Sequence, residues 1–144
     1  MGQKALDRWV EKRGRLNQFA PPMPIHVTII QIVVAVGFVA AGLAKLLGAK
    51  PIAEQFKEFG LPRYAMYIVG ALELAGAAGV FLQSVGFLAS IGLCILMLGA
   101  IGQHLKVKHP FSMIAPSVLL LTLSGALAAF LYQEGFWVPL GYLD

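Results

Sequence analysis

Four long runs of apolar residues, each about the length of a membrane crossing, dominate the pattern of this 144-residue chain. They cover approximately residues 26–47, 63–82, 85–105 and 111–132. A helix needs ~20 apolar residues to cross a hydrocarbon layer of ~30 Å, and its backbone must be hydrogen-bonded within the protein. No alternation of polar and apolar residues indicates a barrel. The pattern therefore predicts an all-α fold, a four-transmembrane-helix bundle over residues 25–133.

A shorter amphipathic helix is predicted between the first and second runs. Pro51 stands where the first turn of a helix tolerates proline, and Gly60 stands where a helix ends. Ile52, Phe56 and Phe59 then fall on one face of this helix. We expect the helix to lie at the membrane surface.

The N-terminal segment, residues 1–24, combines basic residues with apolar ones at helical spacing. This pattern predicts a helix that lies flat in the headgroup layer. Gly14 and Asn17 weaken a helix, so a disordered basic tail is the alternative. Residues 134–144 form a short C-terminal tail. The apolar residues of the N-terminal pattern are Leu6, Trp9, Val10, Leu16 and Phe19.

Composition excludes a soluble domain, because 58% of the residues are hydrophobic and only 12% are charged, against roughly 25% charged in soluble domains. The formal net charge is +4, yet five of the eleven basic residues lie within the first fifteen positions. That clustering favours contact with anionic lipid over contact with nucleic acid.

Orientation is not decided by charge, because five Lys and Arg residues lie on the terminal side and six on the other. The density of the N-terminal cluster favours both termini in the cytoplasm, with the bacterial cytoplasmic (inner) membrane as the location. The first apolar run is longer than the ~7–15-residue core of a signal peptide, so we expect it to stay in the membrane.

Glu73 is the most informative residue for function. It lies about ten positions into the second run, roughly 15 Å along a helix, which places it in the middle of the membrane. An ionisable group there costs at least ~2–3 kcal/mol, so it should face the interior with a partner or be protonated. It is either a proton or ligand site, or a structural acid that pairs with a neighbouring helix.

Lys45 and His104 end the first and third runs on the side where the second run begins. Lys45 is roughly 10 Å shallower than Glu73 by helix rise, a gap that two extended side chains can nearly bridge. Lys45 could instead extend outward to the headgroups, and His104 could be a polar cap. His26 lies a bilayer away from His104, which excludes a haem held by both. The sequence contains no zinc spacing and no phosphate loop.

Small residues are frequent in the second run and predict close helix contacts. Packing within the bundle is favoured over an oligomer interface. The predicted packing residues are Gly70, Ala71, Ala75, Gly76 and Gly79.

Four motifs follow one another along the chain: Gly42-Leu43-Ala44-Lys45-Leu46, Phe59-Gly60-Leu61-Pro62, Gly70-Ala71-Leu72-Glu73-Leu74-Ala75-Gly76 and His104. In this order they resemble the DoxX-like family, and the resemblance covers roughly residues 26–130. The resemblance implies a four-helix membrane bundle related to a subunit of a thiosulfate:quinone oxidoreductase, with Lys45, Glu73 and His104 at the corresponding positions. Members are linked to oxidative-stress complexes or to assembly of partner membrane proteins. The single cysteine, Cys94, departs from dithiol chemistry.

Our first functional hypothesis is a non-catalytic subunit or assembly partner of a membrane complex, in which Lys45, Glu73 and His104 specify packing. The alternatives are a quinone-linked oxidoreductase subunit, with Glu73 or His104 taking up a proton, and a small proton-coupled transporter that acts as an oligomer. We expect no metal and no resident cofactor, with quinone as the one candidate. Expected partners are the lipid bilayer, other membrane or redox proteins and a second copy of the chain, but no nucleic acid.

Overall fold

The computed structural model describes residues 2–8, 11, 23–82 and 85–133, and these contain helices and no strand. The predicted all-α class is confirmed, and each long helix begins and ends within three residues of its predicted run. A short helix covers residues 3–8; the rest of the predicted N-terminal helix and the C-terminal tail lie outside the described residues. The main helices are α2 (Ile25–Leu46), α3 (Lys50–Glu58), α4 (Arg63–Gly79), α5 (Gly86–Lys106) and α6 (Phe111–Gln133).

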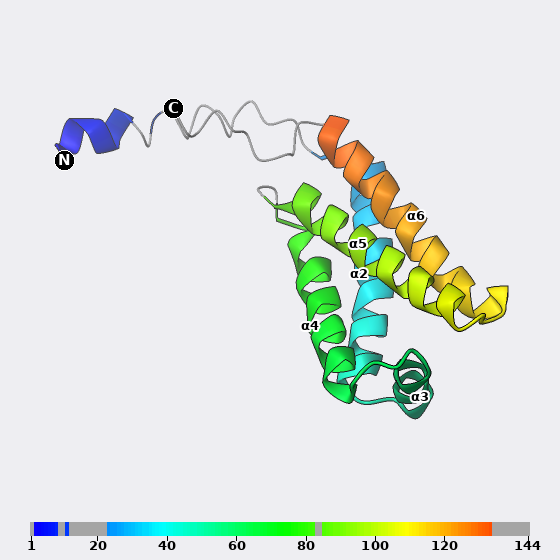
Figure 1. Ribbon diagram of the computed structural model, residues 1–144. Coiled ribbons are helices and arrows are strands. Elements are labelled where there is room, and N and C mark those ends of the chain that lie inside the picture. The colour runs from blue at the N-terminus through cyan, green and yellow to red at the C-terminus, as the bar shows by residue number, and fades with distance from the viewer. Residues whose placement is uncertain (1, 9–10, 12–22, 83–84, 134–144) are drawn as a thin grey trace.

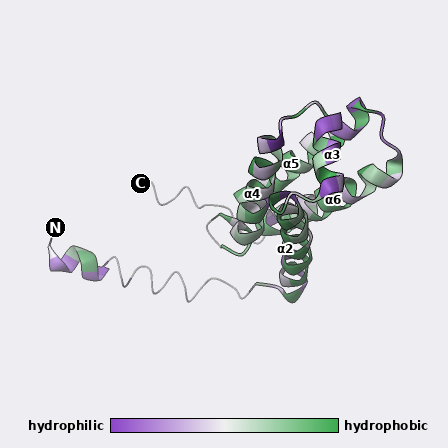
Figure 2. Cartoon of the chain, turned by 90° about the horizontal axis from the view of Figure 1, so that it is seen from below, coloured by the Kyte–Doolittle hydropathy of each residue, from purple (hydrophilic) through white to green (hydrophobic). Residues whose placement is uncertain are grey.

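Three of the described helices, α2, α5 and α6, are long and apolar enough to cross a membrane. The chain is accordingly an integral membrane protein. Figure 2 shows the hydrophobic colour along the long helices and hydrophilic residues on α3 and the connections near it. α4 has 17 residues, fewer than the ~20 of a typical crossing. Three helices are therefore candidate spans by length and composition, and the fourth span stays a prediction.

The long helices form two antiparallel pairs. α2 packs along α4, and α5 packs along α6. Contacts of α2 with α6 and of α4 with α5 join the pairs, and Figure 1 shows α5 crossing in front of α2. The ends of α2 and α5 and the starts of α4 and α6 consequently lie toward the same end of the bundle, where α3 is also found.

The two helices α2 and α4 approach most closely at Gly42 and Gly70. A Cβ atom on Gly42 would lie 2.8 Å from the carbonyl oxygen of Gly70, and one on Gly70 would lie 2.9 Å from that of Gly42. Side-chain carbons do not approach backbone oxygens this closely, so both positions require glycine. Lys45 on α2 and Glu73 on α4 each lie about one turn beyond this crossing. The close approach of the two helices brings their side chains within reach of each other.

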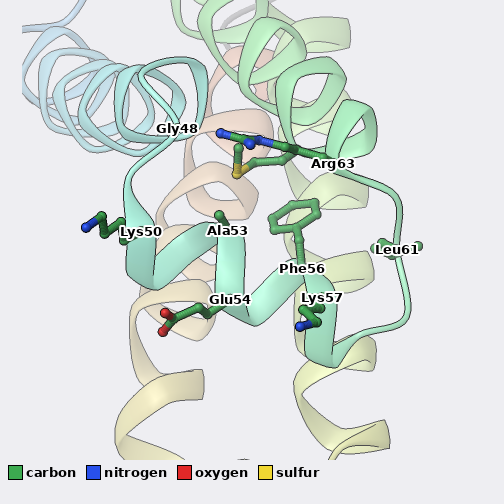
Figure 3. Close-up of a pocket in the computed structure, with 9 residues that line it drawn as sticks. Gly48, Lys50, Ala53, Glu54, Phe56, Lys57, Leu61 and Arg63 are labelled. Atoms are coloured by element: carbon green, nitrogen blue, oxygen red, sulfur yellow. The ribbon is translucent and has the colours of Figure 1, made fainter.

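α3 connects α2 to α4 and is the short helix predicted from the sequence. Figure 3 shows it between Gly48, after α2, and Arg63, at the start of α4. Gly48 and Gly60 have φ values of +67° and +72°, a backbone conformation that favours glycine at the two ends of the connection. Phe56 and Phe59 are buried, so the apolar face of α3 packs onto the bundle.

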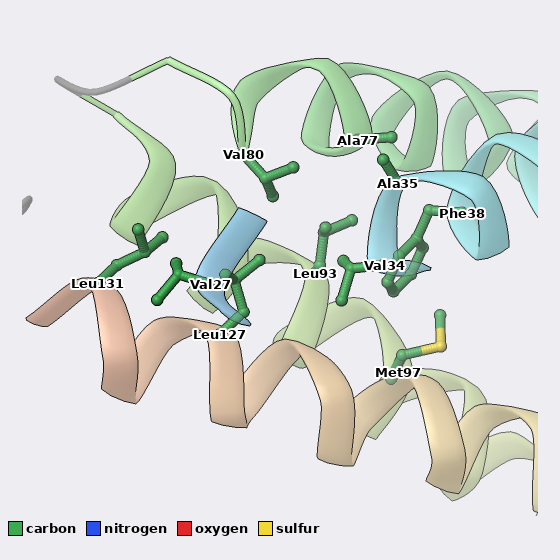
Figure 4. Packing of buried hydrophobic residues seen from close by; sticks show 10 residues of the cluster. All are labelled: Val27, Val34, Ala35, Phe38, Ala77, Val80, Leu93, Met97, Leu127 and Leu131. Carbon is green, nitrogen blue, oxygen red and sulfur yellow. The ribbon is translucent and has the colours of Figure 1, made fainter. Parts of the chain in front are cut away.

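An apolar cluster fills the opposite end of the bundle, where α2 and α5 begin and α4 and α6 end. Figure 4 shows side chains from all four helices meeting there. The amide of Gln31 donates a 2.8 Å hydrogen bond to the carbonyl of Val80, which satisfies a carbonyl at the end of α4. The cluster consists of Val27, Val34, Ala35, Phe38, Ala77, Val80, Leu93, Met97, Leu127 and Leu131.

Candidate functional site

Lys45 and Glu73 form an ion pair inside the bundle. The Lys45 Nζ atom lies 2.9 Å from Oε1 and 2.8 Å from Oε2 of Glu73. The Glu73 side chain is 0% exposed and that of Lys45 is 15% exposed. Of the alternatives left open by the sequence, the structure has Lys45 paired with the acid rather than extended to the headgroups.

The direction of helical side chains explains how these two residues meet. Each lies three residues beyond the Gly42–Gly70 crossing, so they are ~9 Å apart along the antiparallel axes. A helical side chain leans toward the N-terminus of its own helix. Lys45 therefore leans back along α2, where Nζ lies 3.5 Å from the carbonyl oxygen of Ala41. Glu73 leans back along α4, which runs antiparallel to α2. The two side chains therefore point toward each other.

The pair borders a cavity of about 440 Å³. Its volume lies within the ~300–1,000 Å³ range of small-molecule sites. All five helices contribute to its wall, and most of the lining side chains are apolar. Lys45 and Glu73 enter from α2 and α4, and His104 enters from α5. The cavity therefore brings together the three site residues that the sequence predicted. Its apolar lining includes Ala41, Ile52, Phe56, Phe59, Val69, Ile95, Leu96, Met97, Met113 and Leu120.

Gln103 adds an unusual polar atom to this wall. Its Oε1 atom is buried and accepts no hydrogen bond from any described residue. A buried acceptor without a donor costs roughly 1–3 kcal/mol, so it requires an explanation, and a redox or catalytic role is one. A ligand that donates a hydrogen bond would satisfy this atom. The sequence did not single Gln103 out, because a glutamine near the end of a span has many ordinary uses.

His104 does not contact the ion pair directly but belongs to a second polar group. Its Nδ1 atom lies 2.8 Å from Nδ1 of His109, and Nε2 of His109 lies 2.9 Å from Oε2 of Glu58. The ring of Phe59 packs against both imidazoles, with centroid distances of 5.0 Å and 5.8 Å. Glu58 is a residue that sequence reasoning missed. It is 51 positions from His109, and no local pattern links them.

The predicted packing residues divide between two faces of α4. Besides Gly70, a Cβ on Gly76 would lie 2.5 Å from a methyl carbon of Leu93, and one on Gly79 would lie 2.9 Å from Cβ of Ala89. Ala71 and Ala75 are exposed instead. They lie two residues from Glu73, or ~200° around the helix, so an inward Glu73 turns them outward. The glycines thus lie in close contact with neighbouring helices, and the two alanines lie on the outer face of α4.

A second hollow of about 410 Å³ lies beside α3, between Gly48 and Arg63. Its charged residues, Lys50, Glu54, Lys57 and Arg63, are all exposed. No buried polar group faces it. We therefore take the cavity beside Lys45 and Glu73 as the candidate site. Among residues 2–8, 11, 23–82 and 85–133, no three His, Cys, Asp or Glu side chains are grouped as a metal site requires; the absence of a metal stays a prediction.

Comparisons with known proteins agree with the expected family. The model of a family described as the DoxX-like family matches residues 29–127. A protein of Bacillus subtilis (strain 168) named "Putative oxidoreductase CatD" is 28% identical over 87 residues, which are 60% of this chain and 64% of that protein. The match thus spans less than two thirds of the relative. No solved structure matches the chain.

Proposed function

We propose, from the premise that this chain belongs to the DoxX-like family, that it is a subunit of a membrane redox complex and holds the head group of a quinone. The observation that carries the proposal is the mostly apolar cavity of about 440 Å³ with a few convergent polar groups. An apolar molecule with a polar head matches this lining. The name of the Bacillus subtilis relative, an oxidoreductase, supports the same class of function.

The polar groups suit the two oxygens of a quinone head. A quinone becomes a quinol by taking up two electrons and two protons, so its oxygens change from hydrogen-bond acceptors to donors. The ammonium group of Lys45 can exchange its long 3.5 Å contact with the carbonyl of Ala41 for a hydrogen bond to the quinone oxygen. The Oε1 atom of Gln103 accepts, which favours the quinol hydroxyl. His104 can do either. A redox protein on another chain supplies the electrons, and this chain contributes binding, orientation and a proton route.

We further propose that α4 is a fourth span, in the bacterial cytoplasmic membrane with both termini in the cytoplasm. α4 packs along α2, and its outer face presents Ile68 and Leu72, which are 54% and 50% exposed. Such side chains suit contact with lipid. The Glu73 carboxylate points inward and is paired with Lys45, which removes the main objection to burying α4 in the bilayer.

A purely structural role is the second candidate function. In that case the chain is a non-catalytic assembly partner, and the Lys45–Glu73 pair fixes the register of α2 against α4. The observation that favours it is that both oxygens of Glu73 are already satisfied within the chain. It leaves the buried Oε1 atom of Gln103 without an explanation, so the quinone-binding function is preferred.

The test is retention of quinone by the purified protein. The chain, extracted in native nanodiscs, should retain quinone detected by mass spectrometry. Gly99 lines the cavity, and a Cβ there meets no atom within 4 Å. Gly99→Leu should therefore fill the cavity without a backbone clash and lower retention at least ~10-fold, equivalent to about 1.4 kcal/mol of binding.

Gly92→Leu is the matched control. Gly92 lies two turns earlier on α5, has the same open surroundings and does not line the cavity. Retention should stay at the wild-type level in this variant. Partner proteins recovered in stoichiometric amount without any quinone would reject quinone binding and support the assembly function.

A further inference from the structure

Three ionisable side chains form an unbroken hydrogen-bonded row from the surface of the protein to the cavity. Glu58, on α3, has a side chain that is 56% exposed, and it contacts His109, whose side chain is 12% exposed. His109 contacts His104 through the two Nδ1 atoms, 2.8 Å apart. His104 is 7% exposed and lines the cavity. Each step along the row leads to a more buried group.

The contact between the two Nδ1 atoms fixes how many protons it holds. A hydrogen bond needs one donor and one acceptor, so one of these nitrogens carries a proton and the other does not. The carboxylate of Glu58 in turn receives a proton from Nε2 of His109 or gives one to it. His109 is thus bonded at both ring nitrogens and His104 at Nδ1, and each ring can pass a proton to the next group in the row.

The backbone holds the two imidazoles in this arrangement. Lys108 has a φ of +58°, an uncommon conformation for a residue other than glycine, and it folds the chain back at the end of α5. The amide of His109 then donates a 3.0 Å hydrogen bond to the carbonyl of His104. Phe59 covers both rings. The row is therefore shielded from water along its length and open at Glu58.

The other charged groups near the row leave it intact. Lys57 lies beside Glu58 on α3, and Lys106 and Lys108 flank the end of α5; all three are exposed. Across the cavity, Lys45 and Glu73 of α2 and α4 neutralise each other. The residues with which α6 lines the cavity carry no ionisable group; they are Met113, Pro116, Ser117 and Leu120.

We infer that Glu58, His109 and His104 form a proton-transfer path between water and the cavity. A proton on Glu58 passes to Nε2 of His109, Nδ1 of His109 gives its proton to Nδ1 of His104, and Nε2 of His104 gives its proton to the ligand. Each imidazole gains one N–H bond and loses one, so both stay neutral. The reverse sequence carries a proton out. Both rings regain their starting tautomers when a proton moves back along the row.

For the identity of the ligand, this inference rests on the proposed quinone function; the path itself does not. It is tested with ¹⁵N-histidine-labelled protein in nanodiscs, by measuring exchange of the His104 ring proton with water. Glu58→Gln removes the group that exchanges protons with water and should slow this exchange about 100-fold, the lower end of what a positioned acid or base contributes. Glu58→Asp should restore most of the rate.

Glu54→Gln is the matched control, because Glu54 is an exposed glutamate on the same helix that does not line the cavity. It should leave the exchange rate unchanged. Equal rates in the wild type, Glu58→Gln and Glu54→Gln would overturn the path. Quinone retention is measured on the same samples. If the wild-type protein retains no quinone, the quinone function is rejected but the proton path is not. Normal quinone retention together with slowed exchange in Glu58→Gln supports both the quinone function and the proton path.

Discussion

The two ends of the helix bundle are built in opposite ways. At the end where α2 begins, ten apolar residues form a packed cluster, and the buried polar atoms bond to nearby backbone. Ser90 and Ser124, for example, donate to the carbonyls of Gly86 and Leu120 within their own helices. At the end where α2 finishes, the helices line a cavity of about 440 Å³. Its wall contains an ion pair, a histidine and an acceptor that has no donor among the described residues.

Because of this difference, we expect the apolar end of the bundle to determine stability and the cavity end to determine function. Removing atoms from the apolar cluster leaves a void, which costs packing energy. Adding atoms to the cavity displaces no protein atom. We therefore expect substitutions at the apolar end to change the free energy of unfolding, and substitutions at the cavity end to change ligand retention. There are two exceptions. The ion pair belongs to the cavity but also joins α2 to α4, and Met97 belongs to both the apolar cluster and the cavity lining.

The largest effect is expected from breaking the ion pair. Lys45→Met leaves the Glu73 carboxylate buried without a cation and should lower the free energy of unfolding by roughly 3–5 kcal/mol, measured by steric trapping in bicelles. The deficit should shrink as the pH falls, because protonation of Glu73 removes the unpaired charge.

The double substitution Lys45→Met and Glu73→Leu sharpens this prediction. An apolar pair of similar size often matches or exceeds the stability of a buried ion pair, so the double variant should recover most of the loss. Lys50→Met, which removes an exposed lysine, should change the free energy by less than ~0.5 kcal/mol. A double variant as unstable as Lys45→Met would contradict the assignment of the loss to an unpaired charge.

A somewhat smaller loss is expected in the apolar cluster. Leu93 is 1% exposed, and Leu93→Ala should lower the free energy of unfolding by about 2–5 kcal/mol while quinone retention stays at the wild-type level. Leu98→Ala on the same helix, where Leu98 is 57% exposed, is the control and should have little effect. Loss of quinone from Leu93→Ala would show that the two ends are not independent.

Much of this architecture follows from the sequence, because hydrophobic length alone locates the long helices. The depth of Lys45 and Glu73 also follows, since helix rise brings them within side-chain reach. Whether the two side chains meet depends on the direction in which each one leans. These directions converge because α2 and α4 are antiparallel. The small size of Ala71 and Ala75 predicts that they make close helix contacts, whereas the inward direction of Glu73 leaves both exposed on the outer face of α4.

The second polar group could not be predicted in the same way. The contact of Glu58 with His109 joins a short helix to a loop 51 positions away. It also depends on the positive φ of Lys108, and the conformational preference of lysine does not predict a positive φ. Contacts of this kind arise from tertiary packing, so the periodicity of apolar residues does not predict them.

The smallest change in stability, and the sharpest separation of the two properties, is expected at Gln103. Gln103→Leu removes a buried acceptor that has no donor among the described residues, so the free energy of unfolding should stay constant or rise by up to ~1 kcal/mol. Quinone retention should fall, because the quinol hydroxyl loses its acceptor. Gln133→Leu, at the exposed end of α6, should alter neither quantity. A clear loss of stability in Gln103→Leu would mean that this amide stabilises the fold. The strongest observation in favour of a ligand in the cavity would then be removed.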